Sequence, residues 1–231
     1  MTDEVFRMLR DRIVSGELTA GARVDVSTLS DELGISRTPI REAILQLETA
    51  GLVDRQPYRG TVVTGIDPGR LEEVTALRID LEGRAAALGV PRLTDADVTE
   101  MTRILDELER RSDDDDFSFG VFNDLNSAFH TVLYRAADAP VLSALIERLG
   151  AEADRIRLHF DLRSPLAEAF HRRILAACAA RDTASAVDAT RRHLLESYFG
   201  MRGERVVHPG ILADVLTAAE HASLDGADAA S

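Results

Sequence analysis

The chain has 231 residues, of which 45% are hydrophobic, and a formal net charge of −13 at pH 7. This composition supplies a packed core, but no apolar run approaches the ~18–20 residues that a membrane-spanning helix needs. The first residues include Asp3 and Glu4 and lack the apolar block of a secretory signal. The single cysteine, Cys178, excludes an intramolecular disulfide, and we expect it to pack as a small apolar residue. We therefore expect a cytoplasmic protein with no membrane partner, and its acidity argues against indiscriminate coating of nucleic acid.

Residues 1–66 predict a winged helix-turn-helix. Apolar residues from Val5 to Val14 recur on one face of a first helix. A short second helix is expected at about 27–33, ending at Gly34, where a left-handed backbone costs least. Ser36 is expected to cap a third helix that runs to about residue 50. Two short β-prone pieces around a polar turn then predict a small hairpin, the wing.

Two arginines of the third helix, Arg37 and Arg41, are four residues apart and therefore share one face. Recognition helices present their first turns to the major groove, and an arginine can donate two hydrogen bonds to a guanine. Helix N-termini and small hydroxyl side chains suit phosphate oxygens. The alternative is that both arginines pair with surface acids such as Glu42. The predicted DNA contacts are Ser36, Arg37, Thr38, Arg41, Arg59 and Gly60.

The stretch "RDRIVSGELTAGARVDVSTLSDELGISRTPIREAILQLETAGLVDRQPYRGTVV" resembles the DNA-binding domain of GntR-family bacterial transcription regulators. The resemblance spans roughly residues 5–63 and implies binding of double-stranded DNA. The chain departs from the family pattern at Thr19-Ala20-Gly21, where a Pro-Gly turn is usual, and at Ser27, where the change implies one phosphate contact fewer. Neither departure affects the two arginines.

The chain from residue 67 to residue 222 predicts an all-α helical bundle, so the fold class is mainly α. Helical periodicity places helices at about 68–89, 94–111, 117–137, 140–160, 164–181, 183–201 and 209–221. Asp67-Pro68 predicts a helix start, and "TDAD" at 94–97 resembles a capping box. The acidic run 113–116 is expected in a loop, and residues 223–231 are expected to form a disordered tail.

Three of the six histidines indicate a metal site. On one unbroken helix His171 and His193 would lie ~33 Å apart, but "ARDTAS" around Asp182 predicts a turn that brings them level. His130 follows Asn126 by one helical turn, on the same face. Together these residues form a set of ligands suited to divalent Zn, Ni, Mn or Fe. The alternative is that each histidine is a hydrogen-bonded residue of the core.

The segments "LRIDLEGRAAAL", "NSAFHTVLYRAADAPVL" and "LAEAFHRRILAACAARDTASAVDATRRHL" resemble the FCD ligand-binding domain of the FadR branch of the same family. The resemblance implies a metal site formed by Asn126, His130, His171 and His193, with Asn126 in place of the usual aspartate. An amide is a weaker, neutral ligand, so the ion keeps a charge near +2 and favours a small carboxylate effector. Arg78 is predicted either to bind the far carboxylate of that effector or to form a salt bridge with Glu82.

The sequence thus predicts a homodimeric regulator, a repressor as is usual in this family, whose affinity for a palindromic operator is controlled by the effector. The first alternative is a metal-dependent hydrolytic enzyme, although no HExxH-like pair of base and ligand is present. The second is the same regulator with a metal-free pocket for a larger acyl-type ligand.

Overall fold

The computed structural model describes residues 1–65, 67–112, 119–157, 165–203 and 205–218. The chain divides into two compact units, Met1–Pro68 with Asp154–Asp161, and Gly69–Ala153 with Leu162–Ser231. The predicted division after residue 66 lies two residues from the first of these boundaries. The acidic run 113–116 and the predicted disordered tail lie outside the described residues.

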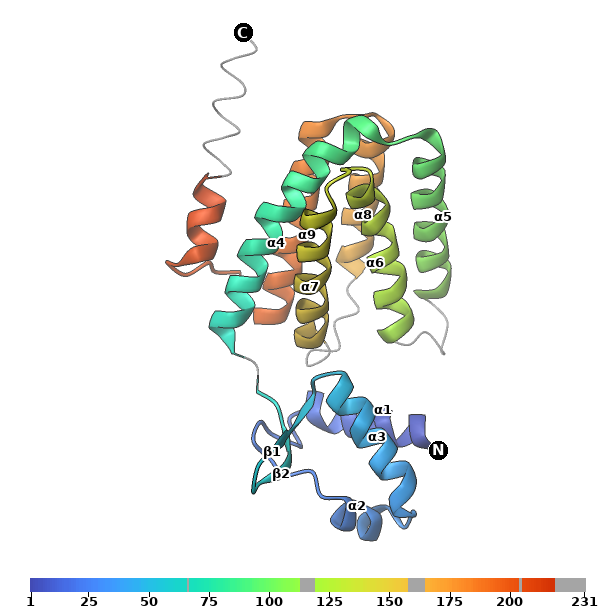
Figure 1. Cartoon of the computed structure of the whole chain (residues 1–231), viewed down its shortest axis with the longest axis vertical. Helices are drawn as coiled ribbons and strands as arrows, with labels where there is room; N and C mark the ends of the chain where they lie inside the picture. Colours follow the sequence, from blue (N-terminus) through green and yellow to red (C-terminus); the bar gives the residue numbers. More distant parts are fainter. Residues whose placement is uncertain (66, 113–118, 158–164, 204, 219–231) are drawn as a thin grey trace. The chain divides into compact units, whose positions relative to one another are not determined.

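The smaller unit is a winged helix-turn-helix, as the sequence predicts (Figure 1). Its elements are α1 (Thr2–Val14), α2 (Val26–Leu33), α3 (Arg37–Thr49), β1 (Val53–Gln56) and β2 (Gly60–Val63). The two strands are antiparallel, with Val53 opposite Val63 and Gln56 opposite Gly60. The core that joins the helices to the wing is built from buried aliphatic side chains, among them Val5, Leu9, Leu29, Ile40, Leu47 and Leu52.

Local signals fix the start and end of α2. Asp25 is its N-cap residue and accepts hydrogen bonds from the backbone N–H groups of Ser27 and Thr28, at 3.1 and 3.0 Å. Gly34 closes it with a φ of 66°, the left-handed conformation that the sequence predicts. Ser36 is the N-cap residue of α3, as expected, but its side chain makes no capping hydrogen bond.

The larger unit is an all-helical bundle, which confirms the predicted fold class (Figure 1). Its elements are α4 (Pro68–Gly89), the 3₁₀ turn η1 (Val90–Arg92), α5 (Asp95–Ser112), α6 (Phe119–Arg135), α7 (Pro140–Arg157), α8 (Pro165–Ala179) and α9 (Thr183–Arg202), and residues 211–218 are also helical. The 3₁₀ turn was not predicted. It contains Pro91, which has no N–H with which to continue an α-helix.

The predicted capping box at the start of α5 is confirmed. The Thr94 backbone N–H and hydroxyl donate to Asp97 Oδ2 at 2.8 and 2.6 Å, and the Asp97 N–H donates back to the Thr94 hydroxyl at 3.2 Å. These bonds from Thr94, with a weaker contribution from Arg135, hold the pKa of the Asp97 carboxyl below its ordinary value.

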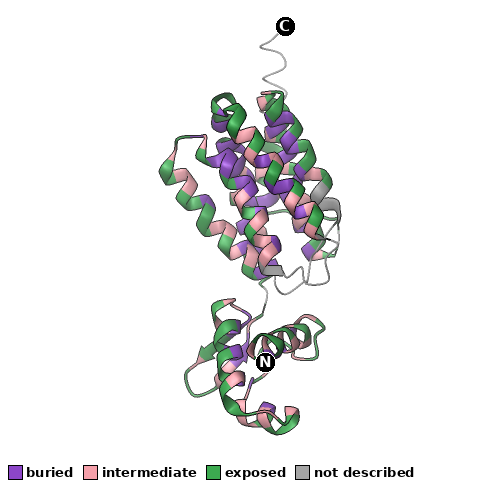
Figure 2. Ribbon diagram, turned by 90° about the vertical axis from the view of Figure 1, so that its right-hand side faces the viewer, coloured by how far each residue is buried: buried purple, intermediate pink, exposed green. Residues whose placement is uncertain are grey.

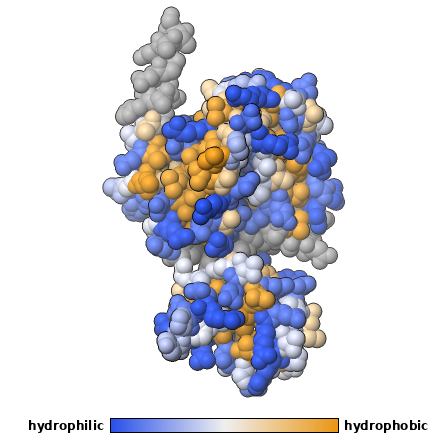
Figure 3. All heavy atoms as spheres, in the orientation of Figure 1, coloured by the Kyte–Doolittle hydropathy of each residue, from blue (hydrophilic) through white to orange (hydrophobic). Residues whose placement is uncertain are grey.

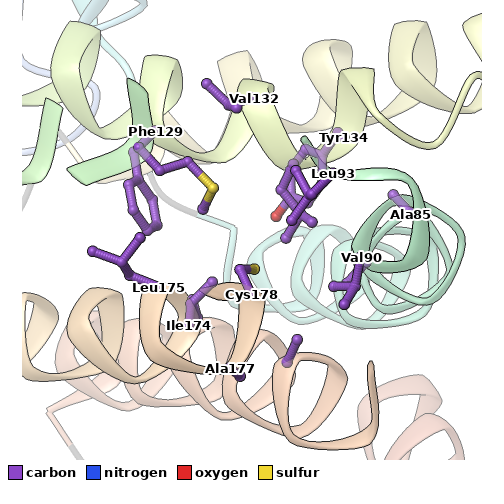
Figure 4. Packing of buried hydrophobic residues seen from close by; sticks show 14 of the residues in the cluster. Ala85, Val90, Leu93, Phe129, Val132, Tyr134, Ile174, Leu175, Ala177 and Cys178 are labelled. Atoms are coloured by element: carbon purple, nitrogen blue, oxygen red, sulfur yellow. The ribbon is translucent and has the colours of Figure 1, made fainter. Parts of the chain in front are cut away.

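The core of the bundle draws side chains from all six helices α4 to α9, and Figure 2 shows the buried residues lining the inside of the bundle. Figure 4 shows Phe129 and Tyr134 of α6 opposite Ile174 and Cys178 of α8. Cys178 is fully buried, as predicted, and burial raises the pKa of its thiol to about 11. Among the described residues, no helix is both long enough and apolar enough to cross a membrane.

Candidate DNA-binding surface and metal centre

The first turns of α3 carry the two arginines on the outside. Arg37 and Arg41 are exposed, whereas Ile40, Ile44 and Leu47 are buried in the core of the smaller unit. Burial of this apolar stripe fixes the rotation of α3 about its own axis, so both guanidinium groups point away from the core. Ser36 and Thr38, at the same end of the helix, are exposed as well.

The contacts of these arginines do not support the alternative hypothesis, in which they form ion pairs with Glu42. Arg37 Nη2 donates to the Ser27 hydroxyl at 3.1 Å, and Glu42 instead accepts a hydrogen bond from the Thr2 hydroxyl at 2.7 Å. Within the described part of the chain, neither Arg37 nor Arg41 forms an ion pair. The cationic face of α3 is therefore not neutralised within the smaller unit.

The wing places Arg59 and Gly60 at its turn, as predicted, with Arg59 exposed and Gly60 at a φ of 77°. A third residue of the wing, Arg23, was not predicted from the sequence. An antiparallel bridge to Val62 holds Arg23 alongside β2, and its Nε lies 3.6 Å from where a Cβ on Gly60 would be. The available signal was the alternating "ARVDV", which is typical of a short extended segment.

Three histidines from three helices meet inside the bundle. His130 comes from α6, His171 from α8 and His193 from α9, and their exposed fractions are 6%, 0% and 6%. One ring nitrogen from each lies within 4.8 Å of the other two. The predicted turn between α8 and α9 brings the rings of His171 and His193 to 4.5 Å between centroids. Asp182 makes this turn by accepting the Ser185 N–H at 3.0 Å as the N-cap of α9.

The spacing of the ring nitrogens of His130 and His171 fits a metal ion. A divalent metal at about 2.0–2.1 Å from two imidazole nitrogens separates them by roughly 2.9–3.4 Å for angles between 90° and tetrahedral. The Nε2 atoms of His130 and His171 are 3.2 Å apart. Phe129 packs against both rings, at 5.2 and 5.1 Å between centroids, and Asn126 is buried one turn before His130. Three nitrogen donors in an apolar setting suit a borderline transition metal.

A chain of polar contacts leads from the histidine cluster to α4. The Tyr134 hydroxyl lies 3.4 Å from His130 Nδ1 and donates to Glu82 Oε2 at 2.5 Å, while Arg78 Nε donates to Glu82 Oε1 at 2.7 Å. Glu82 is 1% exposed and Arg78 11%. Burial, followed by the negative charge of Glu82, raises the pKa of Tyr134 well above its ordinary value, so this phenol remains protonated.

The salt bridge between Arg78 and Glu82 is one of the two alternatives that the sequence leaves open for Arg78. Tyr134 was not predicted from the sequence. The only signal was its position four residues after His130, which puts both side chains on one face of α6.

An exposed arginine pair at the start of the third helix of a winged helix-turn-helix, joined to a helical bundle with a buried histidine cluster, is typical of a DNA-binding transcription regulator. The FCD domain family matches residues 73–196, and the family described as bacterial regulatory proteins, gntR family, matches residues 1–63. The chain therefore belongs to the GntR family of bacterial regulators and carries an FCD domain, in agreement with the FadR branch that its sequence resembles.

Curated relatives and solved structures agree with this assignment. McbR, an HTH-type transcriptional regulator of Escherichia coli (strain K12), is 31% identical over 149 residues, which cover 64% of this chain and 66% of McbR. RspR, an HTH-type transcriptional repressor of the same organism, is 28% identical over 203 residues, 85% of this chain and 86% of RspR. The solved structure of E. coli McbR/YncC has a TM-score of 0.58 and 25% identity, covering 87% of this chain and 97% of that one. These relatives are regulators, and this chain is likewise a regulator and not an enzyme.

Proposed function

We propose that this protein is a metal-dependent, ligand-responsive repressor that releases a palindromic operator when a small carboxylate binds its helical domain. The observation that carries the proposal is the buried cluster of His130, His171 and His193 in a domain joined to a winged helix-turn-helix. The ligand set is these three histidines with Asn126. The operator contacts are Arg37 and Arg41 for base edges, with Ser36, Thr38, Arg59 and Gly60 for the backbone and the wing.

The charges around the cluster favour an anionic effector. The three imidazoles bind a metal in their neutral form, and Asn126 adds no charge. Glu82 is linked to His130 through the Tyr134 hydroxyl, and Arg78 Nε compensates its charge at 2.7 Å. The ion therefore keeps a charge near +2 in a buried site, where interaction with an anion is strong. A carboxylate supplies both the compensating charge and a suitable ligand atom.

Arg78 is the residue proposed to recognise the far end of the effector. Its Nε is held by Glu82, which limits the motion of the guanidinium on α4. A fixed guanidinium is suited to two parallel hydrogen bonds with a carboxylate. This role is compatible with the salt bridge, because one carboxylate does not use all five N–H groups of an arginine.

Dimerisation is supported by apolar side chains on the surface of the larger unit. Leu77 and Leu88 of α4 and Val141 and Leu145 of α7 are exposed. Apolar spheres gather over the part of the larger unit that contains α4 in Figure 3. An operator with two half-sites needs two recognition helices related by a two-fold axis. A homodimer formed by the helical domains would supply them.

The proposed direction of control is release of DNA. RspR is a repressor by name, and an effector that loosens a repressor from its operator switches transcription on. Coupling between the two sites must be reciprocal, so operator DNA lowers the affinity for the effector by the same factor.

The metal is tested by elemental mass spectrometry of the untagged protein beside His171→Ala, with His208→Ala as a control because His208 is an exposed histidine after α9. We expect about one equivalent of a transition metal per chain in the wild type and the control, and loss of it in His171→Ala. Absence of metal from the wild type after reconstitution would overturn the metal site. The search would then turn to larger acyl-type ligands.

The switch is tested on an operator isolated by selection from random duplexes. Fluorescence anisotropy follows the release of this duplex during titration with a panel of small mono- and dicarboxylic acids. We expect at least one acid to weaken binding of the metal-loaded protein by about 5- to 150-fold, the usual range of allosteric coupling. Equal operator affinity with every acid at saturation would refute control by a carboxylate.

A further inference from the structure

We propose that Tyr134 is a positioning residue that fixes the tautomer of His130, with the proton on Nδ1 and the lone pair on Nε2. The tautomer of His130 is set by residues of the protein and does not depend on a bound metal. Only its consequence for metal affinity rests on the metal site proposed above.

The hydrogen bonds that link Arg78, Glu82, Tyr134 and His130 fix where each proton lies. Glu82 has two carboxylate oxygens, and both accept hydrogen bonds, Oε1 from Arg78 and Oε2 from Tyr134. A phenol has one proton to donate, and at 2.5 Å from Oε2 that proton belongs to the bond with Glu82. The phenolic oxygen can then only accept from its second neighbour, Nδ1 of His130 at 3.4 Å.

A neutral imidazole carries one N–H, so a proton on Nδ1 leaves Nε2 with its lone pair. Nε2 of His130 is the atom that faces Nε2 of His171, at 3.2 Å. The contact with Tyr134 therefore presents the correct nitrogen of His130 to the centre of the cluster. The phenol ring also lies nearly parallel to the imidazole, at 15° and 5.9 Å between centroids.

Arg78 sets which groups donate and which accept in the hydrogen bonds that run from Glu82 through Tyr134 to His130. The Arg78 Nε–H group donates to Oε1 of Glu82, so any residue at position 82 must place an acceptor there. In Glu82→Gln the amide oxygen must face Arg78, so the NH₂ group faces Tyr134 and donates to it. The Tyr134 proton then turns to His130 Nδ1, and the imidazole proton moves to Nε2. One isosteric substitution outside the cluster is thus expected to reverse the tautomer of a proposed metal ligand.

The first experiment uses metal-free protein labelled with ¹⁵N-histidine and long-range ¹H–¹⁵N correlation spectra, which distinguish protonated from unprotonated ring nitrogens. His130 is assigned by comparison with His130→Gln. We expect Nδ1–H in the wild type and Nε2–H in Glu82→Gln. Tyr134→Phe should lose the preference for Nδ1–H, whereas Tyr198→Phe, which alters another buried tyrosine on α9, should leave it unchanged. An Nε2–H tautomer in the wild type, or an unchanged His130 in Glu82→Gln, would overturn the proposal.

The second experiment measures Zn²⁺ affinity of the full chain by competition with a chromophoric chelator. Loss of a hydrogen-bond partner behind a metal-binding histidine lowers affinity by about 10- to 100-fold. We expect this loss in Tyr134→Phe and in Glu82→Gln, with Tyr198→Phe at the wild-type value. Wild-type affinity in both variants would refute the positioning role. A wild type that binds no Zn²⁺ would refute the metal site alone, since the spectra test the tautomer without metal.

Discussion

Replacing Gly89 by alanine should separate α4 from α6. A Cβ at residue 89 would lie 2.3 Å from the carbonyl oxygen of Leu133, about 1 Å inside the closest ordinary contact of 3.4 Å. The oxygen belongs to the backbone of α6, so it cannot rotate away as a side chain would. The φ of Gly89 is −78°, which any residue adopts. Glycine is therefore required here for close approach and not for backbone conformation.

The expected magnitude follows from this overlap. Extra atoms forced into a packed core typically cost about 1–3 kcal/mol. For a domain of this size each kcal/mol lowers Tm by about 2–4 °C, so Gly89→Ala should lower Tm by about 2–12 °C. Glu82 lies on α4 and Tyr134 follows Leu133 on α6, so the same displacement should lengthen the contact between these two side chains and weaken Zn²⁺ binding.

The assay is thermal unfolding of the full chain followed by circular dichroism, with Gly150→Ala as the matched control. Gly150 lies within α7, and among the described residues a Cβ there would meet no atom within 4 Å beyond the backbone of its own helix. Alanine is the better helix former by up to about 1 kcal/mol, so the control should keep or raise Tm. If Gly89→Ala is as stable as Gly150→Ala, the close packing of α4 on α6 is refuted.

Four further predictions concern single residues. Arg41→Ala should lose about 1–3 kcal/mol of operator affinity per half-site, measured by anisotropy beside Arg110→Ala, an exposed arginine of α5; equal losses would remove Arg41 from the recognition surface. Asn126→Asp should tighten Zn²⁺ binding in chelator competition, because a charged ligand replaces an amide; no change would place residue 126 outside the ligand set. The depressed pKa of Asp97 gives stability that is present above its unfolded pKa near 3.8 and lost as pH falls through the lower folded pKa. Tm of Asp97→Asn should therefore be lower at pH 7 and flatter below pH ~4 than that of the wild type, and parallel curves would contradict this reasoning. Cys178, with its pKa of about 11, should react with a thiol reagent at pH 8 only when the protein unfolds, and rapid labelling of native protein would contradict its burial.

The sequence predicts features that depend on neighbouring residues. Helical periodicity, Gly34 and the capping box at Thr94 are local signals, and each leads to the observed element. The proximity of His171 and His193 was also predictable, because the turn at Asp182 is local and a hairpin aligns the helices on either side. The turn therefore brings His171 and His193, which are far apart in the sequence, close together in space.

The contacts that position the site depend on which helices are neighbours, and local sequence patterns do not show that. Glu82 and Tyr134 are 52 residues apart and meet only because α4 packs on α6. Arg23 joins the wing through a single bridge to Val62. The alternation around it predicts an extended segment but not the strand with which that segment pairs. Arg78 and Glu82 share a helix face, so their salt bridge was foreseeable, but its link to His130 was not.

The proposed metal and effector should bind cooperatively, and the chain's own residues supply the reason. Asn126 contributes no charge, an imidazole binds a metal in its neutral form, and the charge of Glu82 is compensated by Arg78. An ion bound by such a set gains less than one bound by a carboxylate ligand, and the missing negative charge is what the effector brings. Each guest therefore increases the affinity for the other by the same factor. A regulator built this way responds to the carboxylate only while metal is present, so metal supply and effector concentration act on the operator through a single site.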